Sequence, residues 1–285
     1  MLFVPNNSQG FATILSSWDT TRPAAANGVS VTPNAASNAY GTPVAIGSAL
    51  TSNCYGIMLN INNNSGAVAS RNSAIQLMVD EAGGTSYVAK ITGLLCGSAA
   101  PYTVGGGIFY YFPIFIKSGS TLAVAARGSV ATAFNVGYII YQQPFNPDSI
   151  RVGTFSETLG ITVGTGTVVG TTVVPGTTSD GAWTSIGTTT NAMWWWQVGV
   201  QLPVGDTSWG AAVLHLDIGW GGATPDVIIR DMPVTFNAAE QLSFYPPWGG
   251  CEKMVPAGAT LYARLQSSAI LETGNYTVGI YGIGG

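Results

Sequence analysis

The chain has 285 residues, a net charge of −4 at pH 7 and a charged fraction of only 8%, against about 25% in an average soluble domain. Its nine basic residues are scattered singly, which excludes the basic stripe that nucleic-acid binding requires. No apolar run reaches the ~18 residues that a membrane helix needs.

The first 28 residues show no sustained periodicity. They are rich in Pro, Asn and Ala, with one short apolar segment at 11–15, and residues 1–5 lack the basic and long apolar regions of a signal peptide. Segments of this kind usually fray at the ends of a domain. We therefore expect an extended arm that a neighbouring subunit holds in place.

Strand patterns separated by turn residues follow from residue 29 onward. About eight alternating or short apolar runs occur in some 115 residues up to position 141, with Gly, Asn and Asp clusters between them. This spacing is typical of a sandwich or a barrel. The predicted strands lie at 29–33, 44–46, 55–61, 75–79, 87–91, 108–116, 117–127 and 136–140.

One turn and strand occurs twice. The sequence KSGSTLAVAAR at 117–127 returns as PAGATLYARLQ at 256–266, 139 positions later (256 − 117). Each copy has a Gly-containing turn followed by a strand with alternating faces, and such a strand needs a sheet around it to bury its apolar face. The predicted core-facing residues are Leu122, Val124, Leu261, Ala263 and Leu265.

Six further blocks recur in the same order at offsets between 139 and 142 positions. The alignment pairs Leu214 with Ile75 (214 − 75 = 139) and Arg230 with Lys90 (230 − 90 = 140). Six blocks in one order indicate a tandem duplication with a period near 140. This period is too long for a solenoid unit and is typical of a whole domain.

The sequence therefore predicts an all-β protein of two similar antiparallel β-sandwich, jelly-roll-like domains that arose by internal duplication. No segment longer than about ten residues has the period and caps of a helix. The expected organisation is an N-terminal arm (1–28), domain 1 (29–141), a linker with two prolines (142–154) and domain 2 (155–285).

Motifs for catalysis are weak. The single histidine, His215, lies on the same strand face as Asp217, opposite the apolar face. No Gly-x-Ser-x-Gly elbow is present, and spacing selects no pair of carboxylates for glycoside hydrolysis. An exposed polar pair on a strand is the favoured interpretation of His215 and Asp217. A hydrolase, with His215 or a carboxylate pair in a pocket, remains as a less favoured candidate function.

Metal and cofactor motifs are also weak. Cys54, Cys96 and Cys251 lie far apart without a Cys-x-x-Cys pair, so neither a disulfide framework nor a zinc site is expected. The acidic residues lack the spacing of a calcium loop, and the Gly-rich segment 164–170 has no Lys and opens no helix. We expect no catalytic residue, no metal and no cofactor.

The placement of tryptophan points to binding. Seven of the eight lie in the second half of the chain, and alternation in the triplet at 194–196 turns at least one indole away from the core. Outward indoles stack on sugar rings or anchor protein interfaces, although most of the seven could instead fill the second core. The candidate interface or ligand-binding residues are Trp194, Trp196, Trp209, Trp220 and Trp248.

Two stretches resemble virion structural proteins of tailed bacteriophages. They are VPAGATLYARLQ at 255–266 and DIGWGGATPDVII at 217–229, similar to a Pro-Ala-Gly turn with its strand and to an Ile-Gly-x-Gly strand end in that family. The first copy departs from the pattern, with Lys-Ser-Gly at 117–119. The resemblance implies a duplicated β-sandwich on the surface of the particle, as a capsid decoration or cement protein or a tail component.

The expected function is thus a non-enzymatic structural role in the virion, with major capsid or tail proteins and further copies of the chain as partners. The arm is expected to pair with or lace an adjacent chain. The alternative is a receptor- or carbohydrate-binding module of a phage tail, which would hold a host glycan on exposed tryptophans. Neither nucleic acid nor a membrane is an expected partner.

Overall fold

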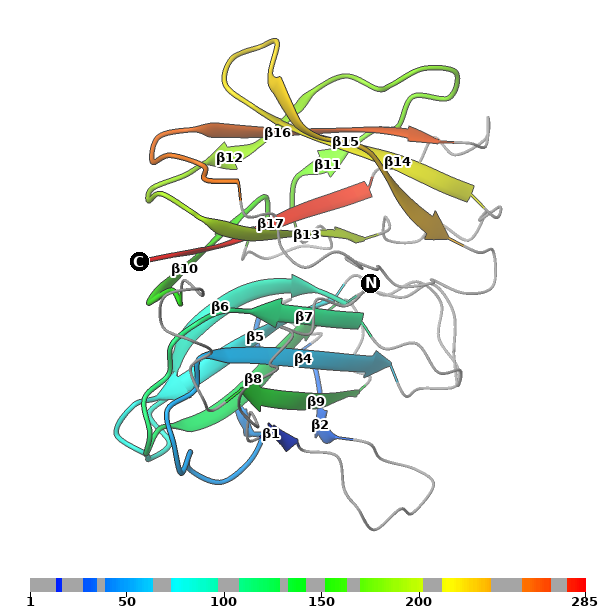
Figure 1. Cartoon of the computed structure of the whole chain (residues 1–285). Coiled ribbons are helices and arrows are strands. Elements are labelled where there is room, and N and C mark those ends of the chain that lie inside the picture. The colour runs from blue at the N-terminus through cyan, green and yellow to red at the C-terminus, as the bar shows by residue number, and fades with distance from the viewer. Residues whose placement is uncertain are drawn as a thin grey trace.

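The computed structural model describes residues 14–16, 28–34, 39–63, 73–96, 108–128, 133–141, 152–162, 170–201, 212–236, 253–267 and 276–285. Within these ranges the chain forms strands β1 to β17 and no helix, hence no helix there that could cross a membrane. The strands of the two halves form two stacked bodies (Figure 1).

The first half forms two antiparallel sheets. In sheet 1, β1 and β2 both pair with β9, which is followed by β4 and β7, and sheet 2 has the order β3-β8-β5-β6. The strands are β1 (Ile14–Ser16), β2 (Val29–Val31), β3 (Val44–Ala45), β4 (Gly56–Asn63), β5 (Ser73–Asp80), β6 (Val88–Leu95), β7 (Ile108–Phe112), β8 (Thr121–Gly128) and β9 (Phe134–Tyr141).

The second half also forms two sheets. In sheet 3, β10, β11 and β13 all pair with β17, and sheet 4 has the order β12-β16-β14-β15. The strands are β10 (Phe155–Leu159), β11 (Thr172–Val173), β12 (Thr184–Thr188), β13 (Trp195–Gln201), β14 (Ala212–Trp220), β15 (Asp226–Phe236), β16 (Thr260–Ser267) and β17 (Tyr276–Gly284).

The two halves have the same strand pairing. Replacing β1–β6 by β10–β15, β8 by β16 and β9 by β17 converts the strand pairs of sheets 1 and 2 into those of sheets 3 and 4. Only β7 has no counterpart among the described residues. From β2 and from β11 onward the chain crosses between the two sheets of its half, except at the directly paired strands β5–β6 and β14–β15 and from β15 to β16, where the counterpart of β7 is lacking. This order is the double Greek key of a jelly roll. The predicted fold, two similar jelly-roll domains from a duplication, is confirmed.

The pairing corrects two offsets of the sequence alignment. Leu216, not Leu214, occupies the ladder position of Ile75 (216 − 75 = 141), and both strands have an irregularity directly after that position. Likewise Arg230 corresponds to Thr92 rather than to Lys90. Both errors are slips of two residues, and a slip of two leaves every side chain on the same face of its strand. The apolar pattern alone therefore could not detect them.

The predicted core faces are confirmed. Leu261, Ala263 and Leu265 on β16 are fully buried, as is Val124 on β8, and Leu122 is 2% exposed. In domain 2 the alternate residues of β16 are half-buried, as expected for a sheet with one outer face. In domain 1 both faces of β8 are buried, so this strand lies deeper than the period-two pattern indicates.

The described part of the arm belongs to its own domain. Ile14–Ser16 forms β1, which pairs with β9 of the same chain. These residues thus pair within their own chain, on the edge of β9 beside β2, and the expected pairing of the arm with an adjacent chain stays a prediction. Most of the linker lies outside the described residues. Its end is bonded to domain 1: the Gly153 amide donates to Pro113 O over 2.9 Å, and Gly153 O accepts from the Phe115 amide over 2.8 Å.

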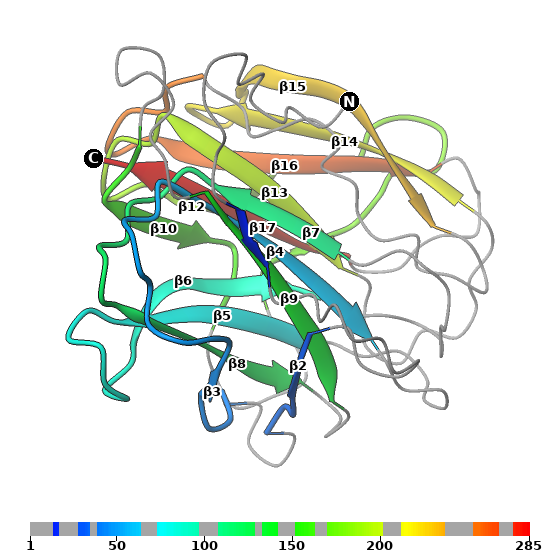
Figure 2. The same ribbon diagram turned by 60° about the horizontal axis from the view of Figure 1, so that its bottom comes forward.

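The two domains meet along β6, beside β10 and β17 (Figures 1 and 2). On the edge of β6, Lys90 O accepts a hydrogen bond from the Ser156 hydroxyl, and Thr92 O accepts one from Thr158 Oγ1 over 2.9 Å. Side-chain hydroxyls of domain 2 thus satisfy carbonyl groups that an edge strand would otherwise leave open.

Tyrosines complete this contact. Tyr281 of β17 is 1% exposed; its hydroxyl donates to Gly93 O over 2.8 Å and accepts from the Leu95 amide over 2.9 Å. Its ring meets Tyr110 of β7 edge to face at 5.4 Å. A side chain on Gly199 would lie 2.8 Å from the Tyr281 hydroxyl, so this glycine permits the close approach. We call this contact between β6, β7, β10, β13 and β17 the domain seam.

Candidate functional site

The described candidate tryptophans differ in burial and surroundings. Trp196 is 1% exposed, and its Nε1 donates to Lys253 O over 3.0 Å; it is a core residue that no surface ligand can reach. Trp220 is half-buried against the core. Trp194 is half-buried and lines a surface cavity. The remaining candidates, Trp209 and Trp248, lie outside the described residues.

Trp195, the member of the triplet that was not among the candidates, faces the other domain. Trp195 is 8% exposed, and its ring meets Tyr111 of β7 edge to face at 5.8 Å. The triplet thus divides as alternation requires, with Trp196 in the core of domain 2 and Trp195 on the opposite face of the strand. That opposite face is covered by domain 1, so this outward indole anchors a contact within the chain.

The cavity beside Trp194 has a volume of about 290 Å³. It lies where the segment before β10, the turn before β13 and the turn before β16 meet the last residue of the chain. The indole of Trp194 and the thioether of Met254, which is 53% exposed, supply its accessible apolar wall, whereas Met193 is fully buried. The lining residues are Val152, Ala192, Met193, Trp194, Met254 and Gly285.

Hydrogen bonds hold the wall of the cavity in place. The carboxylate of Glu157 accepts from the amides of Thr190 and Asn191 over 2.6 and 3.1 Å. Met193 and Val255 exchange backbone hydrogen bonds of 2.8 and 2.7 Å. The Trp194 amide donates to a carbonyl of β17 over 3.1 Å. The segment that carries the indole is therefore fixed from both sides without a ligand.

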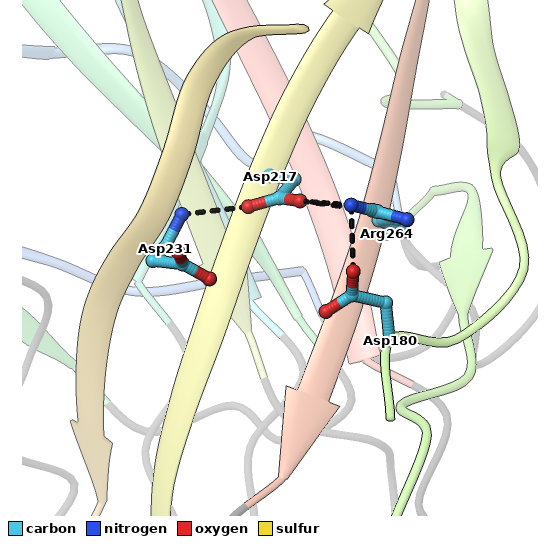
Figure 3. Close-up of polar contacts among 4 residues, drawn as sticks. All are labelled: Asp180, Asp217, Asp231 and Arg264. Carbon is cyan, nitrogen blue, oxygen red and sulfur yellow. Dashed lines mark hydrogen bonds and ion pairs between the residues drawn. The ribbon is translucent and has the colours of Figure 1, made fainter. Parts of the chain in front are cut away.

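The second polar feature is a carboxylate and guanidinium cluster on the outer face of sheet 4 (Figure 3). Asp217 on β14 has a side chain only 3% exposed. Its Oδ2 accepts from Arg264 Nε and Nη2 over 2.9 and 2.6 Å, and its Oδ1 accepts from the Asp231 amide over 2.6 Å. Both oxygens are therefore engaged in structural contacts.

Arg264 is held on three sides. Besides Asp217 it forms an ion pair of 2.6 Å with Asp180, from the loop before β12, and its guanidinium lies 4.5 Å from the centre of the Trp183 ring. Opposite charges and a stacked indole fix its orientation. The cluster fastens the loop at 176–183 to the sheet. It also holds the bulge of β15, the irregularity of its pairing with β14 at Asp231.

The expected His215–Asp217 pair is only partly present. Both side chains point to the same face, as predicted, but His215 is exposed whereas Asp217 is buried and bonded to Arg264. The residues lining the cavity include neither histidine nor a carboxylate side chain. In the described part of the chain no three His, Cys, Asp or Glu side chains are grouped to hold a metal ion.

The corresponding bulge of domain 1 lies at Gly93 on β6, and it is bonded differently. Gly93 there and Asp231 in domain 2 both have positive φ, +70° and +53°. The Gly93 amide donates to the Tyr40 hydroxyl over 2.8 Å, whereas the Asp231 amide donates to a carboxylate. Pro233, near the position of Leu95, has no amide for a tyrosine to accept from. The bulge of β15 therefore cannot form the contact that Tyr281 makes with β6.

Burial dominates the titration of the groups at the domain seam. It raises the pKa of Tyr281 and of Tyr110 well above the ordinary value, and the neighbouring phenol adds to the rise at Tyr110. Burial also raises the pKa of the Cys54 thiol to about 12. These groups therefore stay protonated and neutral at physiological pH, which suits packing and not nucleophilic chemistry.

No protein-family model matches the chain, and no curated protein matches it. Among solved structures it is similar to PNGase F, a glycosylasparaginase from Flavobacterium meningosepticum, with 12% identity over 96% of each chain and a TM-score of 0.33. It is also similar to PNGF-II, with 11% identity over 89% of this chain and 65% of that chain and a TM-score of 0.35. At such TM-scores neither similarity supports a conclusion about this chain.

Proposed function

We propose that the chain is a non-enzymatic structural protein of a bacteriophage particle, packed on the capsid or tail surface and stabilising it through contacts with neighbouring subunits. The observation that carries the proposal is the domain seam, which joins two jelly rolls into one stiff body. The Tyr281 hydroxyl and the two hydroxyls on the β6 edge are all engaged there. Two domains held together in this way can transmit load between neighbours.

Fold and composition support the same role. Jelly rolls are used in viral capsids and in lectins, although a fold alone does not assign a function. The charged fraction of 8% is low for a free soluble protein and suits one whose surface is covered in an assembly. The turn and strand at 255–266 adds the resemblance to phage virion proteins. Further copies of the chain and a capsid or tail protein would be the partners.

The test is the location of the chain in its source. Particles purified on a density gradient are analysed by peptide mass spectrometry and by immunogold labelling with an antibody against the chain. We expect its peptides in the particle band, at a fixed ratio to the major capsid or tail protein, and gold on the particle surface. Peptides confined to the soluble fraction would overturn the proposal, as would turnover of a substrate by the purified chain.

A further inference from the structure

We propose that the cavity beside Trp194 is a carbohydrate site that takes a neutral pyranose ring. The proposal goes beyond the structural role and does not rest on it, because a carbohydrate could bind whether or not the chain belongs to a particle. It stands on the shape of the cavity, on its fixed walls and on a comparison with the same place in domain 1.

The equivalent place in domain 1 is identified by backbone contacts. Met193 and Val255 form a bridge in domain 2, and Cys54 and Ile116 form it in domain 1, each 139 positions earlier (193 − 54 and 255 − 116). The next amide in each copy bonds to the strand that ends its domain: Trp194 to β17, and Tyr55 to Tyr141 O of β9. Trp194 and Met254 therefore correspond to Tyr55 and Phe115.

In domain 1 an aromatic pair occupies this place. The rings of Tyr55 and Phe115 meet edge to face at 5.6 Å. In domain 2 the corresponding Trp194 and Met254 line the cavity of about 290 Å³, a volume near the lower end of small-molecule pockets. The ring contact of domain 1 is thus replaced in domain 2 by an indole and a thioether that line a cavity.

The chemistry of the walls suits a sugar. A pyranose has one apolar C–H face, which stacks on an indole, and a rim of hydroxyls that need donors and acceptors. Trp194 supplies the indole, and Met254, which is 53% exposed, supplies the adjoining apolar surface. The exposed Asn191 and Lys253 directly adjoin lining residues in the chain, and Gly285 offers only backbone polar groups. Glu157 is already bonded to two amides and is not free to pair with an ammonium group, and no lining residue has a charged side chain, so an uncharged sugar is favoured.

The experiment uses the full-length chain. A glycan array identifies the preferred terminal sugar, and saturation-transfer NMR with methyl glucoside, methyl galactoside and methyl N-acetylglucosaminide measures binding of single rings. The test variant is the double change Trp194→Tyr and Met254→Phe, which rebuilds the aromatic pair of domain 1 and preserves the fold. The matched control is Phe115→Met in domain 1. Ala192→Arg, at an exposed lining residue, blocks the cavity independently.

We expect the wild type and Phe115→Met to bind the same glycoside, and the double variant and Ala192→Arg to lose at least about tenfold in affinity, the scale of one aromatic stacking contact. No binding by the wild type on the array or by NMR would overturn the proposal, as would binding that both cavity variants retain. If the chain self-associates and Ala192→Arg alone makes it monomeric, the cavity is a protein contact and the carbohydrate proposal is wrong.

Discussion

Tyr281 and Gly93 join the two domains: the phenol of domain 2 donates to the carbonyl of the domain 1 bulge over 2.8 Å. The bulge itself is common to both copies, but only Gly93 is approached by a tyrosine of the other domain. Its counterpart Asp231 is exposed, and its amide is satisfied by Asp217. The two similar domains therefore use the same bulge differently: in domain 1 it contacts the other domain, and in domain 2 it is bonded to Asp217 of its own sheet.

Tyr281→Phe should weaken the domain seam. The change removes one donor and one acceptor at a fully buried position and leaves Gly93 O and the Leu95 amide without that partner. We expect a loss of about 1 to 3 kcal/mol in the free energy of unfolding, measured by urea denaturation. Tyr262→Phe, on the half-buried outer face of sheet 4, is the matched control. A loss no greater than that of the control would show that the hydroxyl contacts are dispensable.

Alkaline pH should destabilise the chain through the same tyrosines. Burial raises the pKa of Tyr281 and Tyr110 in the folded state, whereas an unfolded tyrosine loses its proton near pH 10. Above that pH the unfolded state binds fewer protons than the folded state, so stability falls as pH rises. This stabilisation is fully present below about pH 10. We expect the melting temperature to fall from there upward, and to fall less steeply in Tyr281→Phe than in Tyr262→Phe. Equal slopes would contradict the assignment.

Asp217→Asn should loosen the outer face of sheet 4. The amide keeps one acceptor for the Asp231 backbone but removes the charge that pairs with Arg264 (Figure 3). Because Asp180 still pairs with the guanidinium, we expect a loss of about 1 to 3 kcal/mol in the free energy of unfolding, below the full cost of breaking a buried pair. Thermal unfolding measures it, with the exposed Asp226→Asn as control. Equal melting temperatures for the two variants would show that the cluster adds no stability.

The fold was predictable from the sequence because its signals are local. Alternation in β4 and β16 and the repeated Gly turns predicted which faces are buried, and the ordered repeats predicted the duplication. The alternation of apolar and polar residues did not predict the exact alignment of the two copies. A shift of two residues keeps each side chain on the same face of its strand. The correct alignment of β14 with β5 and of β15 with β6 is therefore visible only in the strand pairing. Arg127 looks like an outward residue by alternation, yet it is fully buried beside Tyr40.

The candidate site was predictable only in outline. The tryptophan triplet indicated that one indole leaves the core, but which one and towards what depends on the other domain. Trp195 faces Tyr111, a residue 84 positions away (195 − 111), and no local pattern records such a contact. The sequence shows a tryptophan, Trp194, where domain 1 has Tyr55, but it does not show the cavity beside that tryptophan.

The bulge glycine offers the most direct test of the domain seam. Gly93 has φ +70°, and a Cβ there would lie 2.5 Å from Ile161 Cγ2 of domain 2. Gly258 has nearly the same φ, +77°, with nothing within 4 Å of an added Cβ. Gly258→Ala should therefore lose only the backbone strain of about 1 kcal/mol. Gly93→Ala should lose that plus an overpacking cost of about 1 to 3 kcal/mol, because Ile161 has to move. Chemical denaturation of both variants isolates the difference. If the two losses are equal, the domains are not packed tightly at the bulge.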